Sequence, residues 1–192
     1  FMSFLDDKYL LESDSAVAIY AAVKDLPIID PHNHADVAEI AANGNYSNAW
    51  QVFAATDHYV WEVMRKRGVD ENSITGSATP KEKWMELARV MPEIAGNPVF
   101  EWIHLDLRRR FGITDVLCSE NAERIWDEVN ARLATDDFKP LALLKAMNVE
   151  VMCSTDDPVD TLEYHAAVNE KAGRVVIRPT WRPDKAMRIH YP

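Results

Sequence analysis

The sequence predicts a parallel α/β fold, in which a first strand is followed by a long helical segment and then by a strand-helix-strand unit. The apolar runs at residues 26–29, 149–153 and 175–177 are short stretches typical of strands. A helical pattern at residues 161–172 joins the last two runs and closes at Gly173. Because strands joined through a helix pair in parallel, this order indicates the opening of an α/β architecture.

The N-terminal part is predicted to begin with a helix. Val17, Tyr20 and Lys24 recur at helical spacing after Ser13, which can cap the first turn. The apolar run at residues 26–29 then predicts the first strand.

The segment between the first and second strands carries start and stop signals for a series of helices. Thr79 and Glu82 form a capping box with a proline in the first turn, and Gly68 and Gly112 are stop signals. The predicted helices run from Asp57 to Arg67, onward from Thr79, from Asn97 to Phe111, from Ser119 to Leu133 and from Lys139 to Met147. We expect residues 37–147 to form a helical insertion after the first strand.

Three predicted strands are too few for a closed (β/α)8 barrel, which needs eight strands and typically about 250 residues. The chain has 192 residues and shows no internal repeat or low-complexity linker. The fold is therefore either small and open, or a piece of a larger domain.

The composition, with 47% hydrophobic and 27% charged residues, is typical of a soluble globular protein. A net charge of −10 without a cluster of lysine and arginine argues against nucleic acid as a partner. A small anionic substrate remains open, because a pocket needs only one or two local cations. Two cysteines, Cys118 and Cys153, fit a reducing compartment, and no apolar run reaches the length of a membrane span. We expect a cytoplasmic protein.

The sharpest local signal is the pair His32 and His34, directly after the first strand. In extended backbone, residues two apart project to the same side, about 6.5 Å apart along the chain, so both imidazoles can converge on one divalent ion. Polar loop histidines are the alternative, which an isolated His-x-His pattern favours. The position of the pair favours the metal-ligand interpretation, because active sites of parallel barrels lie at the carboxyl ends of strands. Asp30, directly before the pair, offers a carboxylate that could support the ligands.

Two further polar groups follow the second and third predicted strands. Asp156 and Asp157 can orient a histidine ligand, bind sugar hydroxyls or cap the next helix, and the cap is the simplest of these roles. Trp181 and Arg182 place an aromatic ring beside a guanidinium, which can grip a carboxylate with two hydrogen bonds. A surface loop with ion pairs is the alternative interpretation.

A fourth group, Asp57, His58 and Tyr59, lies at the start of a predicted helix. A helix N-terminus attracts anions, and the Tyr59 phenol can donate or pass a proton. A capped aromatic helix start is the simpler interpretation. His104 and His165 lie inside predicted helices with no ligand partner one turn further on, which indicates packing or surface roles.

Taken together, several motifs make the chain resemble the uronate isomerase family of the amidohydrolase superfamily. They match in order across nearly the whole chain. The residues that carry the resemblance are Phe4-Leu5 to Leu10-Leu11, Lys24 to His34, Asp57-His58-Tyr59, Gly96-Asn97-Pro98, Phe111-Gly112-Ile113, Thr155-Asp156-Asp157-Pro158 and Trp181-Arg182-Pro183-Asp184-Lys185.

The resemblance implies that residues 1–192 are the N-terminal, incomplete part of a distorted (β/α)8 barrel. It implies isomerisation of D-glucuronate to D-fructuronate and of D-galacturonate to D-tagaturonate, by proton transfer between C2 and C1, in a homo-oligomer. It also implies a divalent metal, with zinc as the expected ion. The residues that it assigns are His32 and His34 as metal ligands, Tyr59 as the catalytic residue, and Arg182, His58, Trp181 and Asp156 as contacts for the substrate.

One departure from the family pattern bears on activity. Family members continue well beyond this length, and their later strands supply a further metal-ligand aspartate and a second arginine. Two histidines alone leave a catalytic zinc short of its usual three protein ligands. We therefore expect the isolated chain to be incomplete as an enzyme, with a metal-dependent hydrolase of an amide, ester or lactone, or an inactive fragment, as the alternatives.

Overall fold

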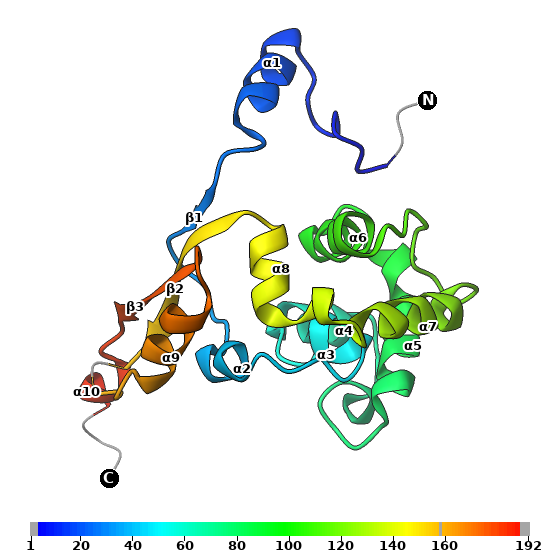
Figure 1. Ribbon diagram of the computed structural model, residues 1–192. Coiled ribbons are helices and arrows are strands. Elements are labelled where there is room, and N and C mark those ends of the chain that lie inside the picture. Colours follow the sequence, from blue (N-terminus) through cyan, green and yellow to red (C-terminus); the bar gives the residue numbers. More distant parts are fainter. Residues whose placement is uncertain (1–3, 158, 189–192) are drawn as a thin grey trace. The chain divides into compact units, whose positions relative to one another are not determined.

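The computed structural model describes residues 4–157 and 159–188 and has an α/β architecture with a small parallel sheet (Figure 1). Two compact units are present. The helical unit comprises Tyr46–Asp136 and the N-terminal segment up to Asp14, and the sheet unit comprises Ser15–Asn45 and the segment from Asp137 onward. The elements in chain order are α1 (Asp14–Val23), β1 (Ile28–Asp30), α2 (Val37–Ala42), α3 (Ala49–Phe53), α4 (His58–Lys66), η1 (Glu71–Ser73), α5 (Pro80–Val90), η2 (Met91–Ile94), α6 (Pro98–Phe111), α7 (Ala122–Leu133), η3 (Asp136–Phe138), α8 (Pro140–Ala146), β2 (Val149–Asp156), α9 (Glu163–Lys171), β3 (Val176–Trp181) and α10 (Asp184–Met187).

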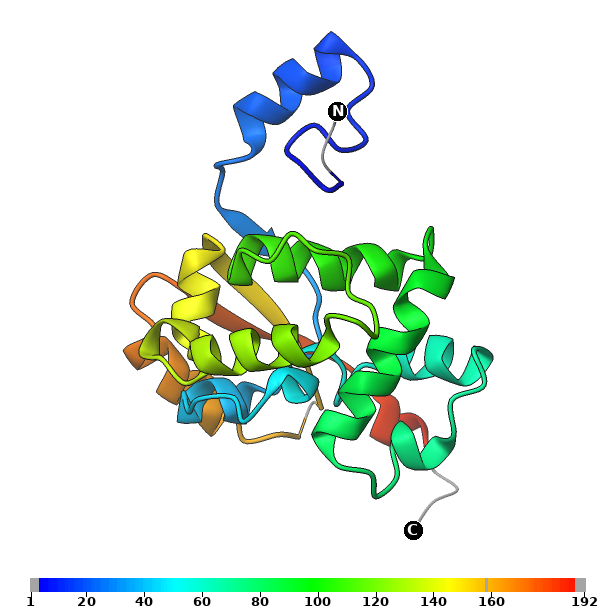
Figure 2. The ribbon, with the colours of Figure 1, turned by 90° about the vertical axis from the view of Figure 1, so that its right-hand side faces the viewer.

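The three strands lie side by side in the order β1-β2-β3, and both pairs are parallel (Figure 2). This confirms the predicted parallel arrangement. Strands β2 and β3 are longer than predicted, because their pairing continues without interruption to Asp156 opposite Trp181. Asp156 and Trp181, which we expected to follow these two strands, are therefore their last residues, and Asp157 and Arg182 come directly after them.

The core of the sheet unit lies between the strands and helices α2, α8 and α9. Side chains alternate between the faces of a strand, so Met152, Ser154 and Asp156 share the face covered by α9, whereas Val151 and Thr155 project from the other face. The buried apolar residues of this core are Val37, Ile40, Leu144, Val149, Met152, Val168, Val175 and Ile177. One face of the sheet is thus packed, and the polar residues at its end belong to two different faces.

The helices of the helical unit begin and end close to the predicted residues and pack around an apolar core. The capping box of Thr79 and Glu82 is present at the start of α5, and Gly112 ends α6 in the left-handed conformation at φ 63°. Trp84 is fully buried and donates its indole N–H to the carbonyl of Ala122, at 2.9 Å. Largest among the fully buried side chains of this unit are Trp84, Phe111, Met64, Ile74, Leu87, Met91, Leu107, Leu117, Ile125 and Leu133.

Some helix boundaries differ from the predictions. Helix α7 begins at Ala122 rather than Ser119, because the side chain of Asn121 accepts a hydrogen bond from the N–H of Cys118 and closes a turn there. The sequence patterns did not separate α2, α3 and α10, which have six, five and four residues. Helices that short show too little of the 3.6-residue period to be detected.

A hydrogen bond joins the two parts of the sheet unit that flank the helical segment in the chain. The N–H of Leu141 donates to the side chain of Asn43 at 3.0 Å, across 98 positions of the chain. Asn43 is also the left-handed C-cap of α2, at φ 50°. Helices α2 and α8, which lie within the expected insertion at residues 37–147, therefore meet in the sheet unit. Among the described residues, no helix combines the length and the apolar character needed to cross a membrane.

We expect acid to loosen the helical unit locally through His104. This buried imidazole accepts from the N–H of Leu117 at Nε2, at 2.9 Å, so its proton resides on Nδ1, which donates to the carbonyl of Phe100 at 2.6 Å. Burial lowers the pKa of His104 below its ordinary value of 6.5. The unfolded state then binds the proton first as the pH falls, and stability that is present above about pH 6.5 is lost below it.

Hydrogen exchange measured around Leu117, corrected for the intrinsic rate, should therefore accelerate as the pH falls through this range. His104→Gln keeps an acceptor for the Leu117 N–H but does not titrate, so its exchange should depend less on pH. An equal pH dependence in both proteins would contradict the assignment to His104.

Candidate functional site

The histidine pair lies in the loop after β1, and both side chains are exposed. The Nε2 atoms of His32 and His34 lie 3.1 Å apart, and the ring planes cross at 86°. Two nitrogens that bind one tetrahedral ion at about 2.0–2.1 Å lie about 3.3 Å from each other. The two rings therefore converge as the sequence predicted and fit two positions around a single divalent ion.

Asn33, between the two histidines, anchors this loop to its surroundings. Its amide donates to Asp30 at 3.0 Å, and its side-chain oxygen accepts from the N–H of Ala35 at 3.0 Å. Its backbone N–H donates to the carbonyl of Cys153 at 3.0 Å, and its carbonyl accepts from the hydroxyl of Thr155 at 2.7 Å. Strand β2 thus fixes the backbone from which both imidazoles project.

Asp30 supports the pair through the backbone. Its carboxylate accepts from the N–H of His32 at 3.2 Å and from the side chain of Asn33. Within the described part of the chain, no group of three or more histidine, cysteine, aspartate or glutamate side chains is placed to hold a metal. His32 and His34 could therefore supply at most two of the three protein ligands that a catalytic zinc usually has.

Removing the Thr155 hydroxyl is expected to weaken metal binding by about 10-fold, because loss of groups that orient metal ligands costs roughly 10- to 100-fold in affinity. Thr155→Val in the full-length protein removes the hydrogen bond to the Asn33 carbonyl and keeps the side-chain shape. Thr155→Ser keeps the hydroxyl and should bind metal like the parent protein. Competition with a chelator measures both, and equal affinities in the two variants would refute the anchoring role.

Trp181 and Arg182 lie where β3 ends. Trp181 is 73% exposed, and the Nε of Arg182 forms an ion pair with Asp184 at 2.5 Å. The backbone N–H of Arg182 donates to the carbonyl of Asp156 at 3.1 Å, which ties the end of β3 to β2. The ion pair uses Nε, whereas the two terminal nitrogens are the pair suited to a second carboxylate.

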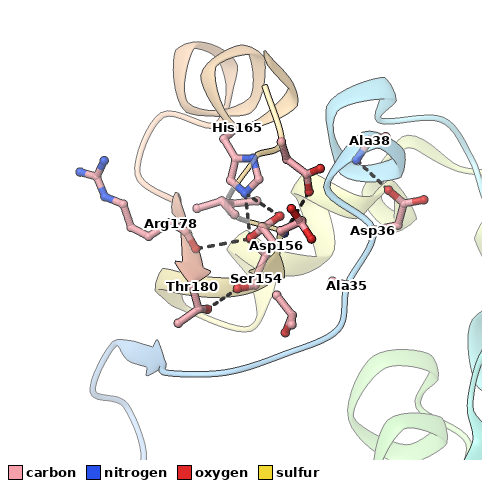
Figure 3. A network of polar contacts seen from close by, with 12 residues as sticks. Ala35, Asp36, Ala38, Ser154, Asp156, His165, Arg178 and Thr180 are labelled. Carbon is pink, nitrogen blue, oxygen red and sulfur yellow. Dashed lines mark hydrogen bonds and ion pairs between the residues drawn. The ribbon is translucent and has the colours of Figure 1, made fainter. Parts of the chain in front are cut away.

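Asp156 lies within strand β2, whereas we expected it to follow the strand. It is the last residue of β2, and its carboxylate lies against Ser154 and His165 on the α9 side (Figure 3). The interpretation of Asp156 and Asp157 as a helix cap is wrong, because the N-cap of α9 is Leu162 and no side chain caps this helix. Pro158, which completes that motif, lies outside the described residues.

His58 and Tyr59 open α4 in the helical unit. The carboxylate of Asp57 accepts from the N–H groups of Tyr59 and Val60 at 2.8 and 3.3 Å, which confirms the predicted cap. The rings of His58 and Tyr59 lie 4.2 Å apart, and the Tyr59 ring meets Trp102 edge-on at 6.0 Å. With 56% of its surface exposed, Tyr59 has a phenol available to a ligand.

Sequence reasoning missed Thr155, Ser154 and His165. The packing interpretation of His165 is confirmed, because the residue is buried, but its contact with the hydroxyl of Ser154 was not predicted. The available signal was a pair of hydroxyl residues at the end of an apolar strand, where side chains alternate between the two faces.

A parallel sheet with a convergent histidine pair and an arginine at the carboxyl ends of its strands defines the class of α/β proteins that build their sites at this edge. A model of the glucuronate isomerase family matches residues 1–192. The chain therefore belongs to the glucuronate isomerase family.

Individual relatives agree with this membership. The uronate isomerase of Thermotoga neapolitana is 52% identical over 97% of this chain and 41% of its own length, and that of Mannheimia succiniciproducens is 43% identical over 98% and 41%. The crystal structure of uronate isomerase from Thermotoga maritima matches with a TM-score of 0.95 at 51% identity, over 100% of this chain and 42% of that one. Glucuronate isomerase from Caulobacter crescentus matches with a TM-score of 0.81 at 33% identity, over 86% and 36%. The chain thus spans about two fifths of the length of these relatives.

Proposed function

We propose that the full-length protein is a uronate isomerase, which converts D-glucuronate to D-fructuronate and D-galacturonate to D-tagaturonate. The observation that carries this proposal is the 52% identity to a uronate isomerase over 97% of the chain. The convergent pair of His32 and His34 and the position of Arg182 support it. The hydrolase alternative is not favoured, because the relatives named above are isomerases.

The reaction moves a proton from C2 to C1 and a hydroxyl proton from O2 to O1, so that the carbonyl passes from C1 to C2. Loss of the C2 proton from the open-chain aldose gives an enediol-like species, and return of a proton to C1 gives the ketose without gain or loss of atoms. In this proposal Arg182 grips the substrate carboxylate, and the phenol of Tyr59 serves the proton transfer between C2 and C1. His58, Trp181 and Asp156 complete the substrate surroundings.

His32 and His34 would hold a divalent ion, with zinc as the expected one, and this ion would supply electrostatic stabilisation of the developing oxyanion. The distance between their Nε2 atoms supports this assignment. The remaining ligand would come from a part of the protein beyond the described residues.

We further propose that the sheet belongs to a distorted (β/α)8 barrel of the amidohydrolase type, in a cytoplasmic enzyme. The parallel order β1-β2-β3 supports the barrel. So do Ile28 and Ile29 on the outer strand β1, which are 47% and 67% exposed and would be covered by further strands. The cysteines of the described chain, Cys118 and Cys153, are both free, which fits a reducing compartment.

The test is isomerisation of D-glucuronate and D-galacturonate by the full-length protein and by residues 1–192, with bound metal quantified in each. Activity in the full-length protein and little or none in the shorter chain is the expected result. Metal-loaded full-length protein that converts neither uronate would refute the proposal and favour a hydrolase.

A further inference from the structure

Three polar side chains form a closed network on the α9 face of the sheet (Figure 3). The hydroxyl of Ser154 lies 2.7 Å from Oδ2 of Asp156 and 2.8 Å from Nε2 of His165. Oδ1 of Asp156 lies 3.4 Å from the same nitrogen. Ser154 and His165 are 1% and 7% exposed, and the side chain of Asp156 is 13% exposed. Desolvated polar groups of this kind are costly unless all are paired, so the network fixes its members.

The hydrogen-bond roles within the network follow from its chemistry. An ionised carboxylate only accepts, and Oδ2 of Asp156 lies 2.7 Å from the serine oxygen, against 3.3 Å for the carbonyl oxygen of Arg178. The single proton of Ser154 is therefore donated to Asp156. The serine oxygen then accepts from His165, and Nε2 of His165 must carry a proton. This arrangement excludes a nucleophilic serine with a histidine base, because such a base would need an unprotonated nitrogen facing the hydroxyl.

The network is connected to Arg182 through the backbone. The carbonyl of Asp156 accepts from the N–H of Arg182 at 3.1 Å. The hydroxyl of Thr180 donates to the carbonyl of Ser154, and Asp156 is the last residue of β2 to pair with β3. The residues that contact His165 are therefore also those that hold the end of β3, from which the guanidinium of Arg182 extends.

We infer that His165 is a positioning residue for substrate binding: its hydrogen bond to Ser154 orients Asp156 and so sets the position of Arg182 for the substrate carboxylate. The identity of that substrate rests on the proposed function. Ser154 and His165 act through Asp156 and Arg182, and neither has to touch the substrate. Small misplacements of a binding group can cost up to about 100-fold, so the network has a measurable effect.

The experiment compares three variants of the metal-loaded full-length protein. His165→Met removes the N–H donor with little change of volume, and His165→Gln restores a donor near the position of Nε2. Ser154→Ala deletes a single oxygen and removes the same hydrogen bond, so it tests the inference even if the methionine variant fails to fold. We expect KM for the uronate to rise about 10-fold in His165→Met and Ser154→Ala, with kcat and metal content close to the parent values, and His165→Gln to recover most of the loss.

Two outcomes overturn the inference. One is an unchanged KM in both His165→Met and Ser154→Ala, and the other is an equal loss in the methionine and glutamine variants, which would indicate a packing role. Hydrogen exchange at the end of β3 gives a readout that does not depend on activity, and it should accelerate in His165→Met and not in His165→Gln. An inactive parent protein would refute the proposed function alone, and the exchange comparison would still decide the role of His165.

Discussion

Replacing Arg182 with alanine in the full-length protein is expected to lower kcat/KM for a uronate by about 30- to 5,000-fold. This range corresponds to the roughly 2–5 kcal/mol that removal of one partner costs if the bound substrate buries the charge pair that its carboxylate forms with Arg182. Most of the loss should appear in KM, because a group that grips the remote carboxylate binds the substrate and the transition state alike. Steady-state kinetics with D-glucuronate measures the effect.

Arg178 provides a matched control for this substitution. It is an exposed arginine on the same strand, β3, so Arg178→Ala removes an equal charge and should leave the kinetics nearly unchanged. Arg182→Lys should recover only part of the loss, because an ammonium group does not match a carboxylate with two parallel hydrogen bonds. Parent-like kinetics of Arg182→Ala would remove Arg182 from the carboxylate-binding role.

Replacing either His32 or His34 with alanine is expected to abolish stable metal binding and, with it, isomerisation. Loss of a group that merely orients a ligand already costs about 10- to 100-fold in affinity, so loss of a ligand itself should cost at least about 100-fold. The two Nε2 atoms lie 3.1 Å apart, so in the proposed metal site each substitution would leave the other ring as the single remaining histidine ligand. Metal content after dialysis and affinity by competition are the measurements.

The variant His58→Ala is the control that distinguishes loss of metal from a general loss of activity. Its predicted role is in the substrate surroundings, so His58→Ala should retain metal while its activity falls. Full metal occupancy in both His32→Ala and His34→Ala would show that the ion is held elsewhere and would overturn the assignment of this pair.

The elements that sequence reasoning placed well are those whose boundaries depend on local interactions. Asp57, Thr79 and Gly112 act on the backbone within one turn, and each is found in its predicted role. The lengths of β2 and β3 could not be predicted in the same way. Asp156 and Trp181 are polar or exposed residues that belong to strands because the neighbouring strand continues to pair with them, and no local pattern records this pairing.

In the candidate site too, the features that depend on local sequence were predicted and those that depend on tertiary contacts were not. The positions of His32 and Arg182 at strand ends followed from the apolar runs before them, together with the rule that parallel sheets build sites at this edge. The contacts of Thr155 with Asn33 and of Ser154 with His165 join residues far apart in the chain or on different elements. These contacts arise from tertiary packing, so the sequence alone could not assign roles to Thr155, Ser154 or His165.

The hydrogen bond between Leu141 and Asn43 has a consequence for the order of folding. Strand β1 must find β2 across the whole helical segment, and closing so long a flexible loop is entropically costly and slow. Once the segment between them has folded, the effective loop between the strands is short, because Asn43 and Leu141, near the two ends of the segment, are joined by a hydrogen bond. Shortening the effective loop by about tenfold saves roughly 2 kcal/mol of closure entropy. Folding of the helices before the strands would therefore assist the pairing of β1 with β2, and with it the placement of the two histidines.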